Sequence, residues 1–243
     1  MSIRNSLLTI VALALGAGVL SGCAFGMVIG SGKSMSETRT VNDFSAVEFA
    51  FLGDLEITQG NEESLTISGD DNIVPLIRTT VRNGTLRIDA SPANIGHAVV
   101  PLRYTLTVKE LDKLALSGLG NIAMDALESG NVALTLSGAG ALSIDALTAD
   151  NLSVTMSGLG SANLRGEVNQ QAVSLSGAGS YYAGDLRSQT AAVRISGLGS
   201  AEVWAVETLA AEISGAGNIQ YIGSPQVAQQ ISGLGSVNSM GND

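Results

Sequence analysis

The chain of 243 residues is short of the residue types on which much protein chemistry depends, with one cysteine and one histidine. Because Cys23 has no second cysteine to pair with, no intramolecular disulfide can form, and stability must come from hydrogen bonds and apolar packing. His97, on an expected loop, offers neither a histidine-based catalytic triad nor a metal site of several histidines. The scarcity therefore excludes two large classes of enzyme site.

Basic residues are also scarce, and the formal net charge is −10 at pH 7. Beyond residue 114 the basic side chains are Arg165, Arg187 and Arg194. Nucleic acid requires a cationic footprint, so this deficit argues against it as a partner. The deficit argues equally against docking onto anionic lipid through charge.

The carboxylates do not form an obvious reactive cluster. Asp70 and Asp71 are adjacent, and neighbouring residues on a strand point to opposite faces, so they predict no acid/base dyad. Asp125 and Asp145 share one repeat position, but Arg165 stands near it in the following repeat. A calcium-binding β-roll needs its Asp in every repeat, so we expect no metal and no other cofactor.

A four-residue phrase, Ser-Gly-x-Gly, organises the second half of the chain. It begins at Ser117, Ser137, Ser157, Ser176, Ser196, Ser214 and Ser232, in steps of 18 to 20 residues. Such a period predicts a solenoid, whose units bury their apolar faces by stacking on one another. Glycine tolerates positive φ and close backbone approach, so the phrase predicts a tight corner. The structural turn residues are Gly118, Gly120, Gly138, Gly140, Gly158, Gly160, Gly177, Gly179, Gly197, Gly199, Gly215, Gly217, Gly233 and Gly235.

Apolar and polar residues alternate on both sides of the phrase. Aliphatic residues stand one and three positions before its Ser, as at Leu134 and Leu136, and the pattern resumes after it, as at Leu142 and Ile144. A period of two indicates strands with one buried face, and two strands and a bend make one coil of a parallel β-helix. We therefore expect an all-β, single-domain, right-handed parallel β-helix over residues 43–243, with regular coils over 111–239.

Two features of the coil are less determined by the pattern. A third, weaker apolar position leaves two-sheeted and three-sheeted coils open; it is occupied by Leu127, Leu147, Leu186 and Val206. The third residue of the phrase alternates between Leu and Ala, from Leu119 to Leu234. We expect it to point inward, because alternating large and small side chains fills a core column evenly. An outward position that alternates through duplication is the alternative.

Residues 44–108 have less regular spacing, and the half of the chain to which they belong holds most of the Lys and Arg. Alternating apolar residues predict strands here as well, and Asn83-Gly84 predicts a tight turn between two of them. We interpret this part as the first coils together with a cap, which a solenoid needs at its ends.

The N-terminus is typical of a targeting segment. Arg4 precedes an apolar stretch over residues 7–20 that is too short for an ordinary membrane-spanning helix. Leu20-Ser21-Gly22-Cys23 resembles the bacterial lipobox. The resemblance implies that residues 1–22 are a lipoprotein signal peptide, cleaved between Gly22 and Cys23, and that Cys23 is lipidated. Ala24, in place of Asp, implies an outer-membrane address, and residues 23–42 are expected to be a flexible tether.

The tether contains Gly30-Ser31-Gly32-Lys33-Ser34, which looks like the end of a phosphate-binding loop. That motif requires a glycine five residues before Gly32, where Met27 stands, with a strand before the loop and a helix after it. We therefore expect no nucleotide partner.

Several motifs together resemble one family. They are Phe44-Ser45-Ala46-Val47, Leu55-Glu56-Ile57-Thr58-Gln59-Gly60, Ser68-Gly69-Asp70-Asp71-Asn72, Asn83-Gly84-Thr85-Leu86-Arg87-Ile88 and the Ser-Gly-x-Gly repeats. From about residue 43 onward, the chain is similar to the GIN-domain family of auto-transporter adhesin head domains. The resemblance implies adhesion and supplies no catalytic residues.

These observations favour a structural or binding role over catalysis. We expect a lipid-anchored rod on the bacterial cell envelope, attached to the membrane through Cys23, that presents ladders of Ser, Thr, Asn and Gln to a glycan or an envelope protein. An envelope assembly or stress-linked periplasmic factor is one alternative. A carbohydrate-active β-helix enzyme is the other, although the acidic residues are scattered over different coil positions.

Overall fold

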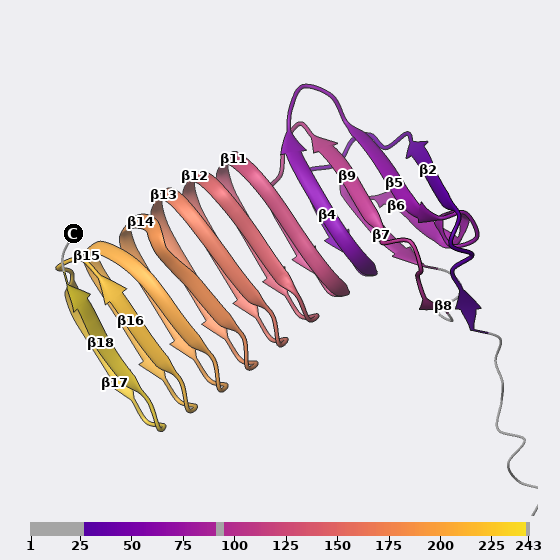
Figure 1. Cartoon of the computed structure of the whole chain (residues 1–243). Coiled ribbons are helices and arrows are strands. Elements are labelled where there is room, and N and C mark those ends of the chain that lie inside the picture. Colours follow the sequence, from indigo (N-terminus) through magenta and orange to yellow (C-terminus); the bar gives the residue numbers. More distant parts are fainter. Residues whose placement is uncertain (1–26, 91–94, 242–243) are drawn as a thin grey trace, which may run out of the picture.

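The computed structural model describes residues 27–90 and 95–241, and these residues are mostly strand (Figure 1). The strands are β1 (Val28–Ile29), β2 (Ser34–Arg39), β3 (Ala46–Phe49), β4 (Leu52–Gln59), β5 (Ser64–Asp70), β6 (Ile77–Arg82), β7 (Thr85–Ala90), β8 (Ile95–His97), β9 (Arg103–Val108), β10 (Lys113–Leu116), β11 (Leu119–Leu136), β12 (Ala141–Met156), β13 (Ser161–Leu175), β14 (Ser180–Ile195), β15 (Ser200–Ile213), β16 (Asn218–Ile222), β17 (Gln226–Ile231) and β18 (Ser236–Gly241). A 3-10 turn covers Val74–Leu76. Among the described residues, no helix has the length and apolarity to cross a membrane.

The long strands β11 to β15 stack in parallel, one repeat per coil (Figure 1). Residues at the same repeat position pair across neighbouring coils, as Leu134 does with Val154, and Val154 with Val173. Each long strand bends between its two halves, so one strand forms both sides of a coil. The all-β parallel solenoid predicted from the sequence is confirmed.

The core of the solenoid consists of columns of apolar side chains that run along its axis. The columns expected on either side of the phrase are buried, as at Leu136 and Leu142. The third apolar position is also buried at Leu127, Leu147 and Leu186. It is Ala205 rather than Val206 that is buried in the next coil, where the pairing of β14 with β15 shifts register.

Shorter strands cap the N-terminal end of the solenoid. β3 pairs in parallel with β10, and β4 with β11, so these two strands form the first coil. β5 pairs antiparallel with β2 and with β9, while β6 and β7 form a hairpin. The hairpin turn is Asn83-Gly84, with φ angles of 50° and 72°, which confirms the predicted tight turn.

The prediction that residues 23–42 form a flexible tether is wrong at Ser34–Arg39, which form the strand β2. β2 pairs with β5 from Ser34 to Arg39, and the Arg39 guanidinium donates a 2.9 Å hydrogen bond to the Val74 carbonyl. β2 lies at the sheet edge and alternates half-buried with exposed side chains, so it lacks the apolar signal of a core strand. Cys23, the signal segment and the cleavage position lie outside the described residues.

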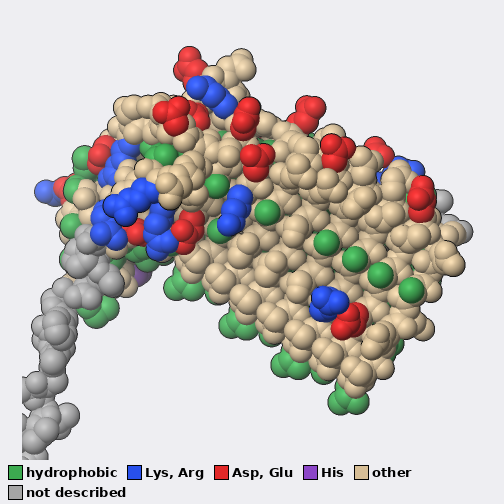
Figure 2. All heavy atoms as spheres, turned by 180° about the vertical axis from the view of Figure 1, so that it is seen from behind, with side chains coloured by type: hydrophobic (Ala, Val, Ile, Leu, Met, Phe, Trp, Pro, Cys, Tyr) green, Lys and Arg blue, Asp and Glu red, His purple; other side chains and the backbone are tan. Residues whose placement is uncertain are grey.

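The inward orientation expected for the leucines of the phrase is also wrong. Leu119, Leu159, Leu198 and Leu234 are 66%, 74%, 71% and 86% exposed. Figure 2 shows apolar side chains projecting in a row along one long edge of the solenoid. The physical reason is that the flanking glycines lie against the preceding coil, where a Cβ on Gly158 would overlap the Gly138 carbonyl oxygen. The residue between the two glycines therefore points to solvent.

Candidate functional site

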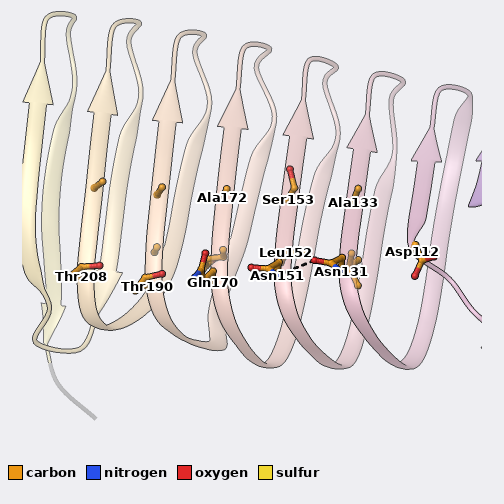
Figure 3. A pocket seen from close by; sticks show the side chains of 15 residues that line it. Asp112, Asn131, Ala133, Asn151, Leu152, Ser153, Gln170, Ala172, Thr190 and Thr208 are labelled. Atoms are coloured by element: carbon orange, nitrogen blue, oxygen red, sulfur yellow. Dashed lines mark hydrogen bonds between the residues drawn. The ribbon is translucent and has the colours of Figure 1, made fainter.

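A concave surface lies on the strand halves that precede each phrase (Figure 3). Its floor is a column of small side chains, four positions before the Ser of each phrase. This floor consists of Ala133, Ser153, Ala172, Ala192, Ala210 and Ala228. We call this surface the groove.

Two polar columns, one on each side of the floor, form the rims of the groove. The first rim consists of Asn131, Asn151, Gln170, Thr190, Thr208 and Gln226. The second rim consists of Thr135, Thr155, Ser174, Arg194, Glu212 and Gln230. Since rim residues on one strand are four positions apart, the rims are separated by roughly 13 Å.

The groove is long and shallow. Two hollows of about 610 and 480 Å³ share Ser153, Ala172, Ala192 and Ala210 as their floor. Neighbouring coils are about 4.8 Å apart, so a floor of six rungs runs roughly 24 Å along the solenoid axis. The small floor residues lower the surface between the rims, so an extended chain can approach the strand backbone closely.

The rims present neutral hydrogen-bonding groups in nearly every coil. Asn151 donates its side-chain amide to the Asn131 side-chain oxygen at 2.9 Å, which fixes both amides in a ladder (Figure 3). Each amide keeps further donor and acceptor capacity, and the Thr190 and Thr208 hydroxyls can both donate and accept. This chemistry suits a neutral ligand that is rich in hydroxyl or amide groups.

The carboxylates at the groove are engaged in other contacts. Asp112, at the N-terminal end of the groove, accepts a 3.0 Å hydrogen bond from the Ser129 hydroxyl. Glu212 pairs with Arg194 at 2.7 Å. Five rungs of about 4.8 Å separate the two carboxylates, roughly 24 Å, whereas the paired acids of glycosidases stand about 5 to 9.5 Å apart. The two carboxylates are therefore not placed to act together as an acid and base pair.

The acidic column considered for calcium contains an ion-pair ladder. Arg165 lies between Asp145 and Asp185, at 3.5 and 3.3 Å from their carboxylate oxygens. Among the described residues, no group of three or more His, Cys, Asp or Glu side chains is placed to hold a metal ion. His97 ends β8 at the surface, where its backbone carbonyl accepts a 2.8 Å hydrogen bond from Gly30.

The segment that looks like a phosphate loop already binds an anion from its own chain. The buried carboxylate of Asp70 accepts hydrogen bonds from the backbone amides of Gly32, Val99 and Val100 at 2.7 to 3.0 Å. Burial alone raises the pKa of Asp70, but the three amide donors outweigh it and hold the pKa below its ordinary value. Asp70 thus ties the first described residues to the cap.

A buried polar chain inside the solenoid was not predicted from the sequence. Tyr181 donates to the Gln171 side-chain oxygen at 3.0 Å, and Gln171 donates to the Ser188 hydroxyl at 2.8 Å. Ser188 in turn donates to the Trp204 carbonyl at 2.6 Å. Gln171 occupies a column that is apolar in neighbouring coils, and this break in the repeat is the signal that could have revealed it. Each polar group is satisfied within the chain, so the contact is structural.

Comparisons with known proteins agree with this architecture. The model of a family described as "Putative auto-transporter adhesin, head GIN domain" matches residues 43–225. The crystal structure of a "putative adhesin" from Bacteroides fragilis is similar at 27% identity and a TM-score of 0.84, covering 88% of this chain and 100% of that one. A "putative adhesin" from Parabacteroides merdae is similar at 25% identity and a TM-score of 0.72, covering 88% and 99%. No curated protein matches the chain.

Proposed function

The chain belongs to the GIN-domain family of auto-transporter adhesin head domains, and on that premise we propose that it is a lipid-anchored adhesin of the bacterial cell envelope whose groove binds an extended, neutral glycan. The continuous small-residue floor between two polar rims is the observation that carries this proposal. Coils repeat about every 4.8 Å, so a polymer lying along the axis meets similar hydrogen-bonding groups at each step. An envelope protein presenting an extended segment is the other ligand class that the groove fits.

The proposed anchor rests on the N-terminal sequence. Leu20-Ser21-Gly22-Cys23 follows an apolar stretch and has the form of a lipobox, and Ala24 favours the outer membrane. Several acyl chains on one residue hold a protein at a bilayer far more firmly than a single chain. A lipid at Cys23 would hold the cap near the membrane and leave the groove available for binding.

The proposed role is binding without catalysis. The two groove carboxylates are far apart, and Glu212 is paired with Arg194. We therefore expect the protein to bind a polysaccharide without shortening it, which size-exclusion chromatography of the polymer after prolonged incubation would show.

A bulky side chain on the floor tests the groove. Ala192→Phe would fill the groove in its middle and should weaken glycan binding at least tenfold, a loss of about 1.4 kcal/mol. Ala123→Phe is the matched control, because Ala123 is exposed on the strand halves that follow the phrase. Binding of the full chain to a panel of neutral glycans and envelope proteins would be measured by calorimetry. Equal affinity of the two variants, or no binding by the wild type, would reject the proposal.

A further inference from the structure

The long edge formed by the phrases is apolar and carries no charge. We call it the leucine edge, after its exposed leucines Leu119, Leu159, Leu198 and Leu234. Leucine stands in every second coil and alanine between, so neighbouring leucines are about 10 Å apart along the axis. Figure 2 shows this row of apolar side chains on one side of the solenoid and most acidic side chains on the opposite side.

Charge is absent from the leucine edge over all seven corners. Residues 117–121, 137–141, 157–161, 176–180, 196–200, 214–218 and 232–236 contain no Asp, Glu, Lys or Arg, in a chain with a net charge of −10. The acids lie toward the far side of the coil, where Asp125, Asp145 and Asp185 are exposed. The solenoid is therefore amphipathic across its width, and an acidic protein exposes one neutral, apolar margin.

The leucine edge continues into the cap. Leu119 pairs with Leu52, so the edge passes through the start of β4. The strand β9 starts beside β4, with Arg103 opposite Asp54. Val99, just before β9, and Met27 and Ile29, at the start of the described chain, are exposed apolar residues. In Figure 1 the tight corners and β8, which pairs with β1, lie on the same lower side of the molecule.

We propose that the leucine edge rests on the surface of a lipid bilayer, with the solenoid axis parallel to the membrane and the leucines in the interface. The inference rests on the proposed lipid at Cys23. Four peptide units join Cys23 to Met27 and span at most about 14 Å, so the lipid holds this side of the cap at the bilayer. A charge-free margin is suited to a bilayer with neutral headgroups, because the acids that anionic lipid would repel lie on the other edge.

A second copy of the chain fits the leucine edge less well. The row is one residue wide and alternates leucine with alanine, glycine and serine. Stable interfaces between proteins bury about 1,200 Å² or more with close complementarity, which a single row of spaced side chains does not provide. A bilayer needs no complementary shape.

Spin labels on the full, processed chain in phosphatidylcholine vesicles test the proposal. Labels would be attached to Leu159→Cys and Leu198→Cys, with Thr148→Cys, exposed toward the acidic side, as the matched control. When Cys23 carries lipid on its sulfur, the introduced thiol alone reacts. Both edge labels should be several-fold less accessible to an aqueous nickel chelate than the Thr148 label and more accessible to oxygen.

The outcomes separate this inference from the proposed anchor. Cosedimentation of wild type with vesicles, and its loss in Cys23→Ala, reports anchoring independently of the labels. If the protein is anchored but its edge labels are as accessible to the chelate as the control label, the proposal that the edge rests on the bilayer is overturned and the proposed anchor stands. If the protection of the edge labels from the chelate disappears when the protein is diluted at constant lipid, the edge contacts a second copy of the chain. That result would also overturn the proposal that the edge rests on the bilayer. Failure of wild type to cosediment would overturn both proposals.

Discussion

At the scale of single residues, most glycines of the phrases are required because neighbouring coils lie so close together. Few of them are required by an unusual backbone angle. Of the fourteen phrase glycines, all of which the structure describes, Gly140 alone has a φ in the left-handed region, at 150°. The Cβ of any other residue would overlap the backbone of the preceding coil at most of these positions, as at Gly158. The repeated glycines therefore permit the close stacking on which the solenoid depends.

Gly158→Ala should destabilise the protein by about 1 to 3 kcal/mol, because the added methyl group must displace backbone in the coil below. Gly130→Ala is the matched control: its added Cβ would meet nothing closer than the Asp150 carboxylate oxygen at 3.9 Å. The control should change the free energy of unfolding by no more than about 0.5 kcal/mol. Urea unfolding of both variants measures the difference, and equal midpoints would contradict the role given to close approach.

Asp70 should make stability sensitive to acid. Its folded pKa lies below the unfolded value of about 3.9, so its contribution is fully present above that value and is lost as the pH falls through the folded pKa. Asp70→Asn should therefore lose less stability than wild type on going from pH 7 to pH 3, although it is less stable at pH 7. Asp89, whose pKa Arg78 and Arg87 lower, keeps part of the acid dependence in both proteins. Parallel unfolding curves at the two pH values decide the question, and an identical acid-induced loss in both proteins would refute the prediction.

At the scale of strands, the terminal strands β17 and β18 close the solenoid with polar residues in core columns. Gln229 follows Ala211 in one buried column, and Ser239 follows Tyr221 in another. The last coil has no coil beyond it in the described chain, so apolar residues here would face solvent. Polar residues at these positions protect an otherwise open sheet end.

Restoring the apolar columns should cause association through this end. Gln229→Val together with Ser239→Val would present an apolar coil face, and the protein should form dimers or larger species at micromolar concentration, seen by light scattering. Gln230→Val is the control, since Gln230 lies on the outward rim of the groove. A strictly monomeric double variant would show that the polar residues have no such protective role.

The sequence pattern located best the strands in which apolar and polar residues alternate strongly. β11 to β15 repeat their apolar positions at nearly constant spacing, so period, register and core columns followed directly. β2 was missed because Ser34, Ser36 and Thr38 give no apolar stripe and its partner β5 is distant in sequence. The leucines were assigned to the wrong side because hydrophobicity suggested burial, whereas the glycines beside them fix the orientation. The groove was foreseen as polar ladders, but its alanine floor could be recognised only once the strands were in register.

At the scale of the whole molecule, three surfaces with different chemistry run parallel to one axis. The groove carries rims of mostly neutral hydrogen-bonding groups, the far margin carries most of the acids, and the corners carry leucines (Figure 2). Because residues at the same repeat position stack on one another from coil to coil, the relative placement of the three surfaces is the same along the stacked coils. Binding along the groove and contact along the leucine edge can therefore occur together without a change in conformation.

The parallel stacking also determines how the molecule yields to force. The hydrogen bonds between coils run along the axis, so tension applied to the C-terminal coil and resisted at the N-terminus would open one rung at a time instead of shearing the whole sheet. Each detached coil would release 18 to 20 residues, roughly 65 Å of extended chain. A solenoid loaded in this direction would lengthen in near-equal steps and dissipate work at each one, while the coils nearer the N-terminus stay folded.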